Sequence, residues 1–312
     1  MGRFTGVLFA SDFDHTISGM DGKIPEKNLE AIRAFIAEGG VFSVASGRGV
    51  PLFRHKASLL PINAPCILYN GAACYDYRTE EYLFTYAMPQ GAQEILEILK
   101  ARYPAVRIEV QTPDACYVFG YDPLRDLYLE RAGVPYFYAG DRPIPAPWLK
   151  IVVYGKFRRP EYDSADILTP EDIARFDEIE RTMRTLSGGR FSVARSMGRI
   201  VECWASGCDK GSSARELAGR LGCTFLAAAG DAPNDIPLLQ EADAAFCPED
   251  CDPSLGAYPF HRVAPCGEGA VAEAIARLDA LRGFCFRQER GIPSRRGGRL
   301  CPPAQFLIQA GA

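Results

Sequence analysis

Two pairs of aspartates stand directly after apolar runs, and their spacing suits catalysis or metal binding. Asp12 and Asp14 follow the run Gly6–Ser11. Asp231 and Asp235 follow a second such run in the last third of the chain. Neighbouring carboxylates repel each other unless a cation lies between them or one of them holds a proton, and oxygen-only ligands suit Mg²⁺. The spacing therefore indicates a cation site, while a polar loop and an acidic helix cap are the alternatives for the two segments taken singly.

Two further segments carry groups that bind anions. Ser46, Gly47 and Arg48 offer a hydroxyl, a flexible backbone and a guanidinium after the apolar run Val41–Ala45. Lys210 stands where a helix is predicted to begin, and the free backbone N–H groups of a helix N-terminus attract anions. For each segment alone, an ordinary strand-to-helix turn or a solvated lysine is the alternative interpretation.

Strands and helices alternate around these segments. Patterns typical of buried strands and amphipathic helices follow one another at Gly6–Ser11, Pro25–Glu38, Val41–Ala45, Val50–Leu60 and Cys66–Tyr69. The same alternation resumes after residue 206 and ends with a helical pattern at Gly269–Arg282. Such alternation predicts an α/β domain with a parallel sheet, and ligands bind outside the carboxyl ends of its strands. We therefore expect the polar segments to meet at that edge.

The middle of the chain has a different pattern. Strand candidates at Val106–Val110 and Cys116–Phe119 follow each other closely, as in antiparallel pairing, and a capped helix is predicted from Thr169. We interpret this stretch as an α+β module inserted into the first domain. The predicted boundaries are residues 1–85 and 206–283 for the core, 86–205 for the insertion and 284–312 for a flexible tail.

Composition excludes several classes of protein. The 312 residues carry 35 basic and 39 acidic side chains, so the net charge of −4 gives no basic footprint for nucleic acid. No apolar run approaches the roughly 20 residues that span a bilayer, and the first residues lack a signal-peptide pattern. The 11 cysteines are scattered without a CxxC pair, which indicates packed, reduced thiols. We expect a cytoplasmic protein that binds neither nucleic acid nor membranes and has no evident protein partner.

Five segments in order resemble the haloacid dehalogenase (HAD) superfamily of phosphatases, and specifically its Cof-type group with a C2B α/β cap. They read DFDHT at Asp12–Thr16, ASGR at Ala45–Arg48, YNGA at Tyr69–Ala72, DKGSS at Asp209–Ser213 and GDAPNDIPLL at Gly230–Leu239. Any one of these motifs is weak, but their order and spacing match the group. The resemblance covers about residues 5–282. It implies a Rossmann-like core with a parallel sheet and a C2B cap inserted between the second and third of the superfamily's catalytic motifs.

The resemblance also implies roles for individual residues. Asp12 would attack phosphorus and form an aspartyl-phosphate, and Asp14 would serve as the acid and then the base. Phosphate would be bound by Ser46, Gly47 and Lys210. Mg²⁺ would be bound by Asp12, Asp231, Asp235 and the backbone carbonyl of Asp14. The residues that would line the substrate side or orient the loops are Arg48, Asn70, Gly71 and Asn234. One residue departs from the family pattern. His15 replaces the usual glycine of the first motif and would be strained if that position has a positive φ.

The implied activity is Mg²⁺-dependent hydrolysis of small phosphomonoesters, such as sugar phosphates or related metabolites. A phosphomutase is the closest enzymatic alternative, because the same aspartyl-phosphate can be returned to a bound substrate. A catalytically silent binding protein on the same fold is the alternative from another class. The presence of Asp12, Asp14, Lys210 and Asp231 argues against a silent protein, which would be free to lose its nucleophile.

Overall fold

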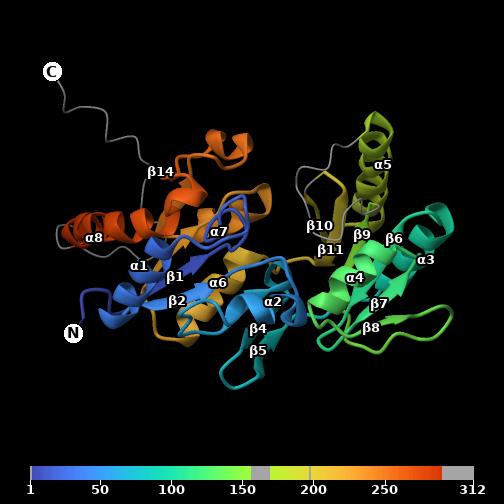
Figure 1. Cartoon of the computed structure of the whole chain (residues 1–312), viewed down its shortest axis with the longest axis horizontal. Coiled ribbons are helices and arrows are strands. Elements are labelled where there is room, and N and C mark those ends of the chain that lie inside the picture. Colours follow the sequence, from blue (N-terminus) through green and yellow to red (C-terminus); the bar gives the residue numbers. More distant parts are fainter. Residues whose placement is uncertain (1, 156–168, 197, 290–312) are drawn as a thin grey trace. The chain divides into compact units, whose positions relative to one another are not determined.

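A computed structural model of the chain describes residues 2–155, 169–196 and 198–289 (Figure 1). The chain divides into two compact units, which we describe separately. The first comprises the described residues of Met1–Ala45, Leu60–Cys66 and Lys210–Ala312, and the second comprises those of Ser46–Leu59 and Ile67–Asp209. Within the described ranges, no helix is both long enough and apolar enough to cross a membrane.

The first unit is built on a five-stranded parallel sheet, which confirms the predicted α/β fold. Its strands lie in the order β14-β13-β12-β1-β2. Their bounds are β1 Val7–Ser11, β2 Val41–Val44, β12 Phe225–Ala229, β13 Ala244–Pro248 and β14 His261–Val263. Four helices pack in pairs against the sheet, α1 (Glu26–Ala37) with α8 (Ala270–Glu289) and α6 (Lys210–Arg220) with α7 (Ile236–Glu241).

Apolar strands explain why this sheet lies inside the unit. Val7, Leu8 and Phe9 of β1 are fully buried, as expected for a parallel strand that is covered on both faces. The ring of Phe9 stacks on Phe42 and Phe246 from strands on either side of it. This packing fixes the carboxyl end of β1, from which the first acidic segment emerges.

The second unit contains a six-stranded, mostly antiparallel sheet in the order β10-β11-β9-β6-β7-β8. Its bounds are β6 Arg107–Gln111, β7 Cys116–Phe119, β8 Tyr136–Tyr138, β9 Lys150–Tyr154, β10 Phe191–Ser196 and β11 Ile200–Ala205. The helices α3 (Ala92–Arg102) and α5 (Pro170–Ser187) cover one face with apolar side chains. Helix α4 (Pro123–Arg131) contributes Leu124 and Leu129 to smaller clusters with Tyr154 and Cys116 of the strands. This architecture agrees with the predicted α+β module.

Several elements of the structure differ from the prediction or were absent from it. Strand β3 (Cys66–Leu68) belongs to a separate small sheet with the hairpin β4 (Ala73–Asp76) and β5 (Glu81–Thr85), which also packs in the second unit together with α2 (Val50–Ala57). Helix α4 was not predicted from apolar periodicity, because its buried face includes Arg125 and Asp126 as well as apolar residues. Helix α8 continues to Glu289, so the first six residues of the predicted tail are helical, and residues 290–312 lie outside the described residues.

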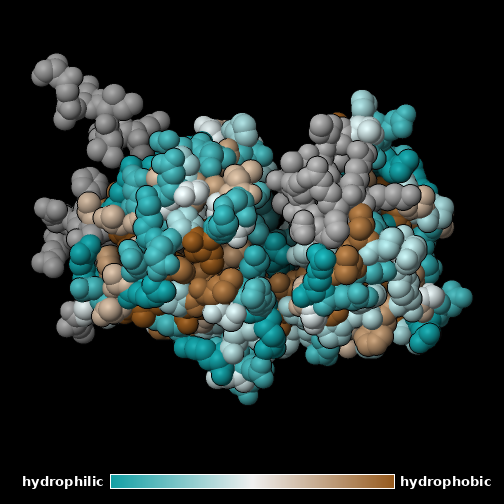
Figure 2. All heavy atoms as spheres, viewed as in Figure 1, coloured by the Kyte–Doolittle hydropathy of each residue, from teal (hydrophilic) through white to brown (hydrophobic). Residues whose placement is uncertain are grey.

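The surfaces and the cysteines agree with expectation for a globular chain. On the face of the molecule shown in Figure 2, hydrophilic side chains predominate and hydrophobic ones form separate patches. The cysteines for which side-chain surroundings are described are free thiols, and most of them are buried. Packed, reduced thiols were predicted for these positions.

Candidate active site

The parallel register of the first unit brings the first and last motifs side by side. Ser11, the last residue of β1, pairs with Ala229, the last residue of β12. The backbone N–H of Asp12 then donates to the carbonyl of Ala229 at 2.8 Å. Asp12 and Gly230 therefore leave the sheet at the same edge, as the strand pattern predicted.

Lys210 links the nucleophile candidate to the last motif. Its Nζ lies 2.6 Å from Oδ1 of Asp12 and 2.6 Å from Oδ1 of Asp235, and the residue is only 1% exposed. Burial disfavours the charged amine, but the two carboxylates outweigh burial and raise the pKa of Lys210 above its usual value. Lys210 is therefore an ammonium ion held at a fixed place beside Asp12.

A tight turn after β12 holds Asp231 and Asp235. Oδ2 of the fully buried Asp235 accepts the backbone N–H groups of Asp231 and Ala232 at 3.1 and 3.0 Å. A Cβ atom on Gly230 would lie 2.5 Å from the Cβ of Asp235, so only glycine leaves room for this arrangement. Oδ1 of Asp231 accepts a 2.9 Å hydrogen bond from the hydroxyl of Thr16. The Asp235 carboxylate is thus oriented by its own turn and by Lys210, and the Asp231 carboxylate is oriented by Thr16 of the first motif.

The carboxylates of this unit fit a divalent cation. Asp12, Asp231 and Asp235 each offer an oxygen, and these atoms all lie within 4.8 Å of one another. Burial, opposed by Lys210 and assisted by the charges of Asp235 and Asp14, raises the pKa of Asp12 to about 7. Burial and the charges of Asp12 and Asp235 raise the pKa of Asp231 to about 9. The negative charge therefore exceeds what Lys210 neutralises, and an oxygen-only donor set of this kind suits Mg²⁺.

The loop after Asp12 contains the departure from the family pattern. Asp14 is close enough for its charge to raise the pKa of Asp12. His15 has a φ of 60°, in the left-handed region that favours glycine. The strain that the sequence suggested for a histidine at this position is therefore present in the backbone.

The second unit brings together the predicted residues of the substrate side. The backbone N–H of Ser46 donates to the carbonyl of Ile67 at 2.8 Å, and the carbonyl of Ser46 accepts the N–H of Asn70 at 3.2 Å. Asn70 lies in the 3₁₀ turn Tyr69–Gly71 with a φ of 57°, a conformation that asparagine tolerates. A Cβ atom on Gly47 would lie 2.7 Å from Oδ1 of Asn70, so the loop and the amide are closely packed.

Arg48 and Gly71 complete this group. Nη1 of Arg48 donates a 2.6 Å hydrogen bond to the hydroxyl of Tyr128 on α4. Gly71 has a φ of 102°, and a Cβ atom there would lie 2.2 Å from the carbonyl oxygen of Asp209. Only glycine permits this close approach, which packs the YNGA turn against the residue before Lys210.

The predicted site residues thus form two groups, one in each unit. Asp12, Asp14, Lys210, Asp231 and Asp235 gather in the first, with Asn234 in the 3₁₀ turn Pro233–Asp235. Ser46, Gly47, Arg48, Asn70 and Gly71 gather in the second.

Sequence reasoning gave no role to Thr16 or Tyr128. The place of Thr16 in the first motif, with its hydroxyl two residues after Asp14, was a usable signal. Tyr128 lies in helix α4, which the apolar periodicity did not reveal, so the sequence held no signal that pointed to this residue.

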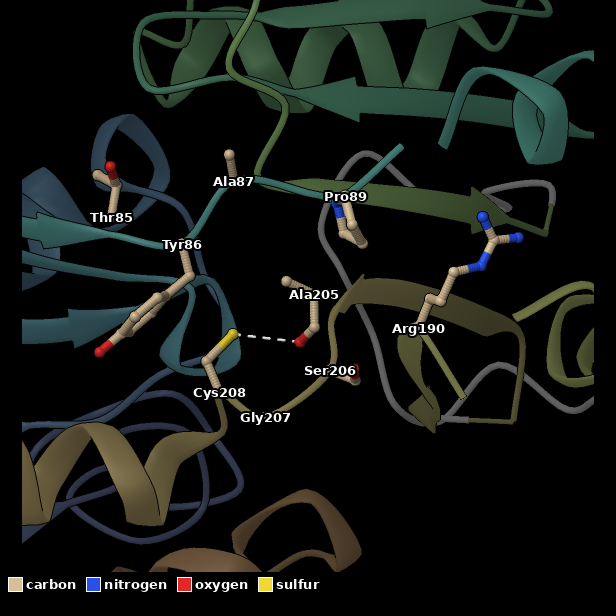
Figure 3. A pocket seen from close by; sticks show the side chains of 9 residues that line it. All are labelled: Thr85, Tyr86, Ala87, Pro89, Arg190, Ala205, Ser206, Gly207 and Cys208. Carbon is tan, nitrogen blue, oxygen red and sulfur yellow. Dashed lines mark hydrogen bonds between the residues drawn. The ribbon is translucent and has the colours of Figure 1, made fainter. Parts of the chain in front are cut away.

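A pocket of about 550 Å³ in the second unit contains none of these residues (Figure 3). Its lining includes Arg190 and Cys208. The guanidinium of Arg190 donates to the carbonyl of Gln90 at 2.8 Å, and the thiol of Cys208 donates to the carbonyl of Ala205 at 3.2 Å. Because both groups are engaged with backbone carbonyls, we assign no chemistry to this pocket.

Comparison with solved structures supports the fold. A haloacid dehalogenase-like hydrolase from Bacteroides thetaiotaomicron is 20% identical with a TM-score of 0.72, over 88% of this chain and 99% of its own. A haloacid dehalogenase-like hydrolase from B. subtilis is 18% identical with a TM-score of 0.69, over 87% and 99%. The sugar phosphatase BT4131, described as a member of HAD subclass IIB, is 17% identical with a TM-score of 0.69, over 87% and 98%. At these identities the likeness shows the fold.

Sequence comparison supplies the family. No curated protein matches the chain in sequence. The family model of haloacid dehalogenase-like hydrolases matches residues 9–275, which include all five motifs and the residues of both site groups. The chain therefore belongs to the haloacid dehalogenase-like hydrolases.

Proposed function

We propose that this protein is a Mg²⁺-dependent phosphatase that hydrolyses small phosphomonoesters through an aspartyl-phosphate on Asp12. The observation that carries the proposal is the position of Lys210, whose buried ammonium contacts both Asp12 and Asp235 while the carboxylate of Asp231 lies beside them. A nucleophilic carboxylate next to a fixed cation and a cluster of oxygen ligands is an arrangement suited to phosphoryl transfer.

The chain's own residues account for each proton and bond in the first step. An oxygen of the Asp12 carboxylate attacks phosphorus, and the bond from phosphorus to the ester oxygen breaks. Asp14, two residues along the same loop, gives its proton to the departing alcohol oxygen. The ammonium of Lys210 stabilises the negative charge on the phosphoryl oxygens, and we assign the hydroxyl of Ser46 and the backbone of Gly47 to the same oxygens.

The second step restores the enzyme. Asp14, now a carboxylate, takes a proton from a water molecule as that water attacks phosphorus. The bond between phosphorus and Asp12 breaks, and inorganic phosphate leaves. Asp12, Asp231 and Asp235, with the backbone carbonyl of Asp14, would hold Mg²⁺, which when bound supplies positive charge that keeps the carboxylates ionised and offsets the charge of the phosphate.

The substrate side of the site is assigned to the second unit. We propose that residues 86–205 act as a cap on the core formed by residues 1–85 and 206–283, and that Arg48, Asn70 and Gly71 face the substrate while Asn234 orients the acidic turn. The fold is shared with a sugar phosphatase, which supports a small phosphorylated metabolite as the substrate class by analogy.

Phosphate release from a panel of phosphomonoesters tests the proposal. The wild type is compared with Asp12→Asn, with added Mg²⁺ and with a chelator. We expect turnover that needs the metal and is lost in the variant. Conversion of an ester to its isomer without phosphate release would point to a phosphomutase, absence of any turnover would point to a binding protein, and release that survives the Asp12 substitution would refute the mechanism.

A further inference from the structure

A buried ion pair joins two adjacent strands of the large sheet in the second unit, beside the loop of Gly47 and the YNGA turn. Lys150 of β9 and Glu202 of β11 lie on adjacent antiparallel strands, and Nζ of Lys150 is 2.6 Å from Oε2 of Glu202. The two residues are only 3% and 5% exposed. Alternation along the strands puts both on the face opposite Ile151 and Cys203, which belong to the apolar core under α3 and α5.

Each member of the pair also holds one of the predicted substrate loops. Nζ of Lys150 donates a second hydrogen bond, of 2.7 Å, to the carbonyl of Gly47. Oε1 of Glu202 accepts a 2.9 Å hydrogen bond from Nδ2 of Asn70. One ion pair therefore connects two strands of the sheet with the loop after β2 and with the YNGA turn.

Stability alone does not explain such a pair. Removing two charges from water is unfavourable, and hydrophobic residues of similar volume often replace a buried ion pair at no loss of stability. Val152 of β9, fully buried and directly opposite Glu202 in the strand register, shows that apolar side chains are accommodated in this region. The pair does supply one donor and one acceptor at fixed places, which apolar residues could not.

The Asn70 amide needs this orientation. Its backbone is in the left-handed region, and its Oδ1 occupies the space that a Cβ on Gly47 would take. With Nδ2 fixed on Glu202, the amide oxygen is directed toward the loop of Gly47. The carboxylate also accepts a 3.3 Å hydrogen bond from the hydroxyl of Ser196, which further fixes its own rotamer.

We infer that Lys150 and Glu202 are positioning residues for substrate binding, which set the Gly47 loop and the Asn70 side chain in the geometry that the substrate requires. The inference rests on the proposed phosphatase function. It adds two residues of the inserted module, outside every sequence motif, to the machinery of that reaction.

Two double variants, differing only at one side chain, test the inference. K150M/E202M removes both charges and every hydrogen bond of the pair. K150M/E202Q also removes both charges but keeps an amide oxygen that can accept from Asn70. For each protein, kcat and KM are measured on the best ester of the panel, together with the melting temperature of the full chain.

We expect K150M/E202M to melt only slightly below the wild-type temperature, because it leaves no unpaired charge and loses only the hydrogen bonds to Gly47, Asn70 and Ser196, while its KM rises roughly tenfold or more with a smaller change in kcat. K150M/E202Q should recover part of that loss, since it retains the contact with Asn70. Should K150M/E202M not fold, K150M/E202Q still decides, because the lost contact with Gly47 must raise its KM.

Three results would overturn the inference. The first is wild-type kinetics in K150M/E202M. The second is wild-type kinetics in K150M/E202Q when K150M/E202M does not fold. The third is an equal loss of activity in both variants together with a lowered melting temperature. Each of these results is read against a wild type that releases phosphate in an Asp12-dependent manner. A wild type that releases none would instead remove the proposed function, and the inference with it.

Discussion

The hydroxyl of Thr16 donates a 2.9 Å hydrogen bond to Oδ1 of Asp231, joining the first and last motifs across 215 positions of the chain. The bond fixes the orientation of a carboxylate that we assign to Mg²⁺. Hydrogen bonds of this kind typically change metal affinity by about 10–100-fold when they are removed. We therefore expect Thr16→Val to raise the Mg²⁺ concentration needed for half-maximal phosphate release by about tenfold, with a smaller effect on the rate at saturating metal.

Thr5→Val is the matched control for this prediction. The hydroxyl of Thr5 donates to the carbonyl of Gly2, and the residue is exposed outside the acidic cluster. Its substitution should leave the Mg²⁺ requirement unchanged. An unchanged requirement in Thr16→Val as well would show that the hydrogen bond does not orient a metal ligand.

Gly230 gives a steric test of the acidic turn. The methyl group of Gly230→Ala would lie 2.5 Å from the Cβ of Asp235, so the turn must move and Asp235 must shift from Lys210. Overpacking of this kind costs about 1–3 kcal/mol, and we expect phosphate release to fall by at least tenfold. Urea unfolding and steady-state kinetics measure the two effects.

Gly219→Ala is its counterpart. Gly219 lies within helix α6, and no atom lies within 4 Å of an added Cβ. Alanine in an unstrained helical position should stabilise the protein by up to about 1 kcal/mol and leave activity unchanged. If Gly230→Ala behaves like this control, the turn does not hold Asp235 as tightly as its packing indicates.

The parallel sheet and its acidic edge could be predicted because their signals are local. The apolar runs before Asp12 and Asp231 identify buried strands, and parallel pairing must bring their carboxyl ends together. Order of the five motifs then sufficed to recognise the family.

The contacts that orient the site could not be predicted, because they join segments far apart in the sequence. Glu202 stands in an ordinary strand pattern, and nothing local shows that its carboxylate meets Lys150 and Asn70. Helix α4 was missed for a related reason. It buries Arg125 against Glu109, so its inward face reads as polar, although Asp122 and Pro123 give a usual start signal.

His15 provides a test of backbone strain in the first motif. A φ of 60° destabilises a non-glycine residue by about 1–2 kcal/mol in the folded state. Glycine removes this strain, but its larger conformational entropy in the unfolded chain offsets part of the gain in stability. We expect His15→Gly to raise the free energy of unfolding by up to about 1 kcal/mol. His55→Gly, in the helical backbone of α2, should lower it by a few tenths of a kcal/mol. A less stable His15→Gly protein would mean that the imidazole makes contacts worth more than the strain.

Glu109 makes the stability of the second unit depend on pH. It is fully buried on β6, with ion pairs of 2.9 Å to Arg107 and to Arg125. Burial alone would raise its pKa, but Arg125 and then Arg107 outweigh burial and lower the pKa of Glu109 below its usual value. A carboxyl with a lowered folded pKa contributes stability that is present above its unfolded pKa and is lost as the pH falls toward the folded value.

Glu109→Gln should therefore be less stable than the wild type by several kcal/mol at pH 7, because two guanidinium groups lose their buried partner. The difference should shrink as the pH falls from about 5 to 3, since only the wild type loses the ionised carboxylate over that interval. Both tryptophans, Trp148 and Trp204, lie in the second unit, so urea unfolding followed by their fluorescence reports on it. Glu180→Gln, which breaks a pair with Arg184 on the surface of α5, should change stability by less than about 1 kcal/mol at either pH. A Glu109→Gln protein whose deficit stays the same at pH 3 and pH 7 would show that the ionised carboxylate is not the source of the stability.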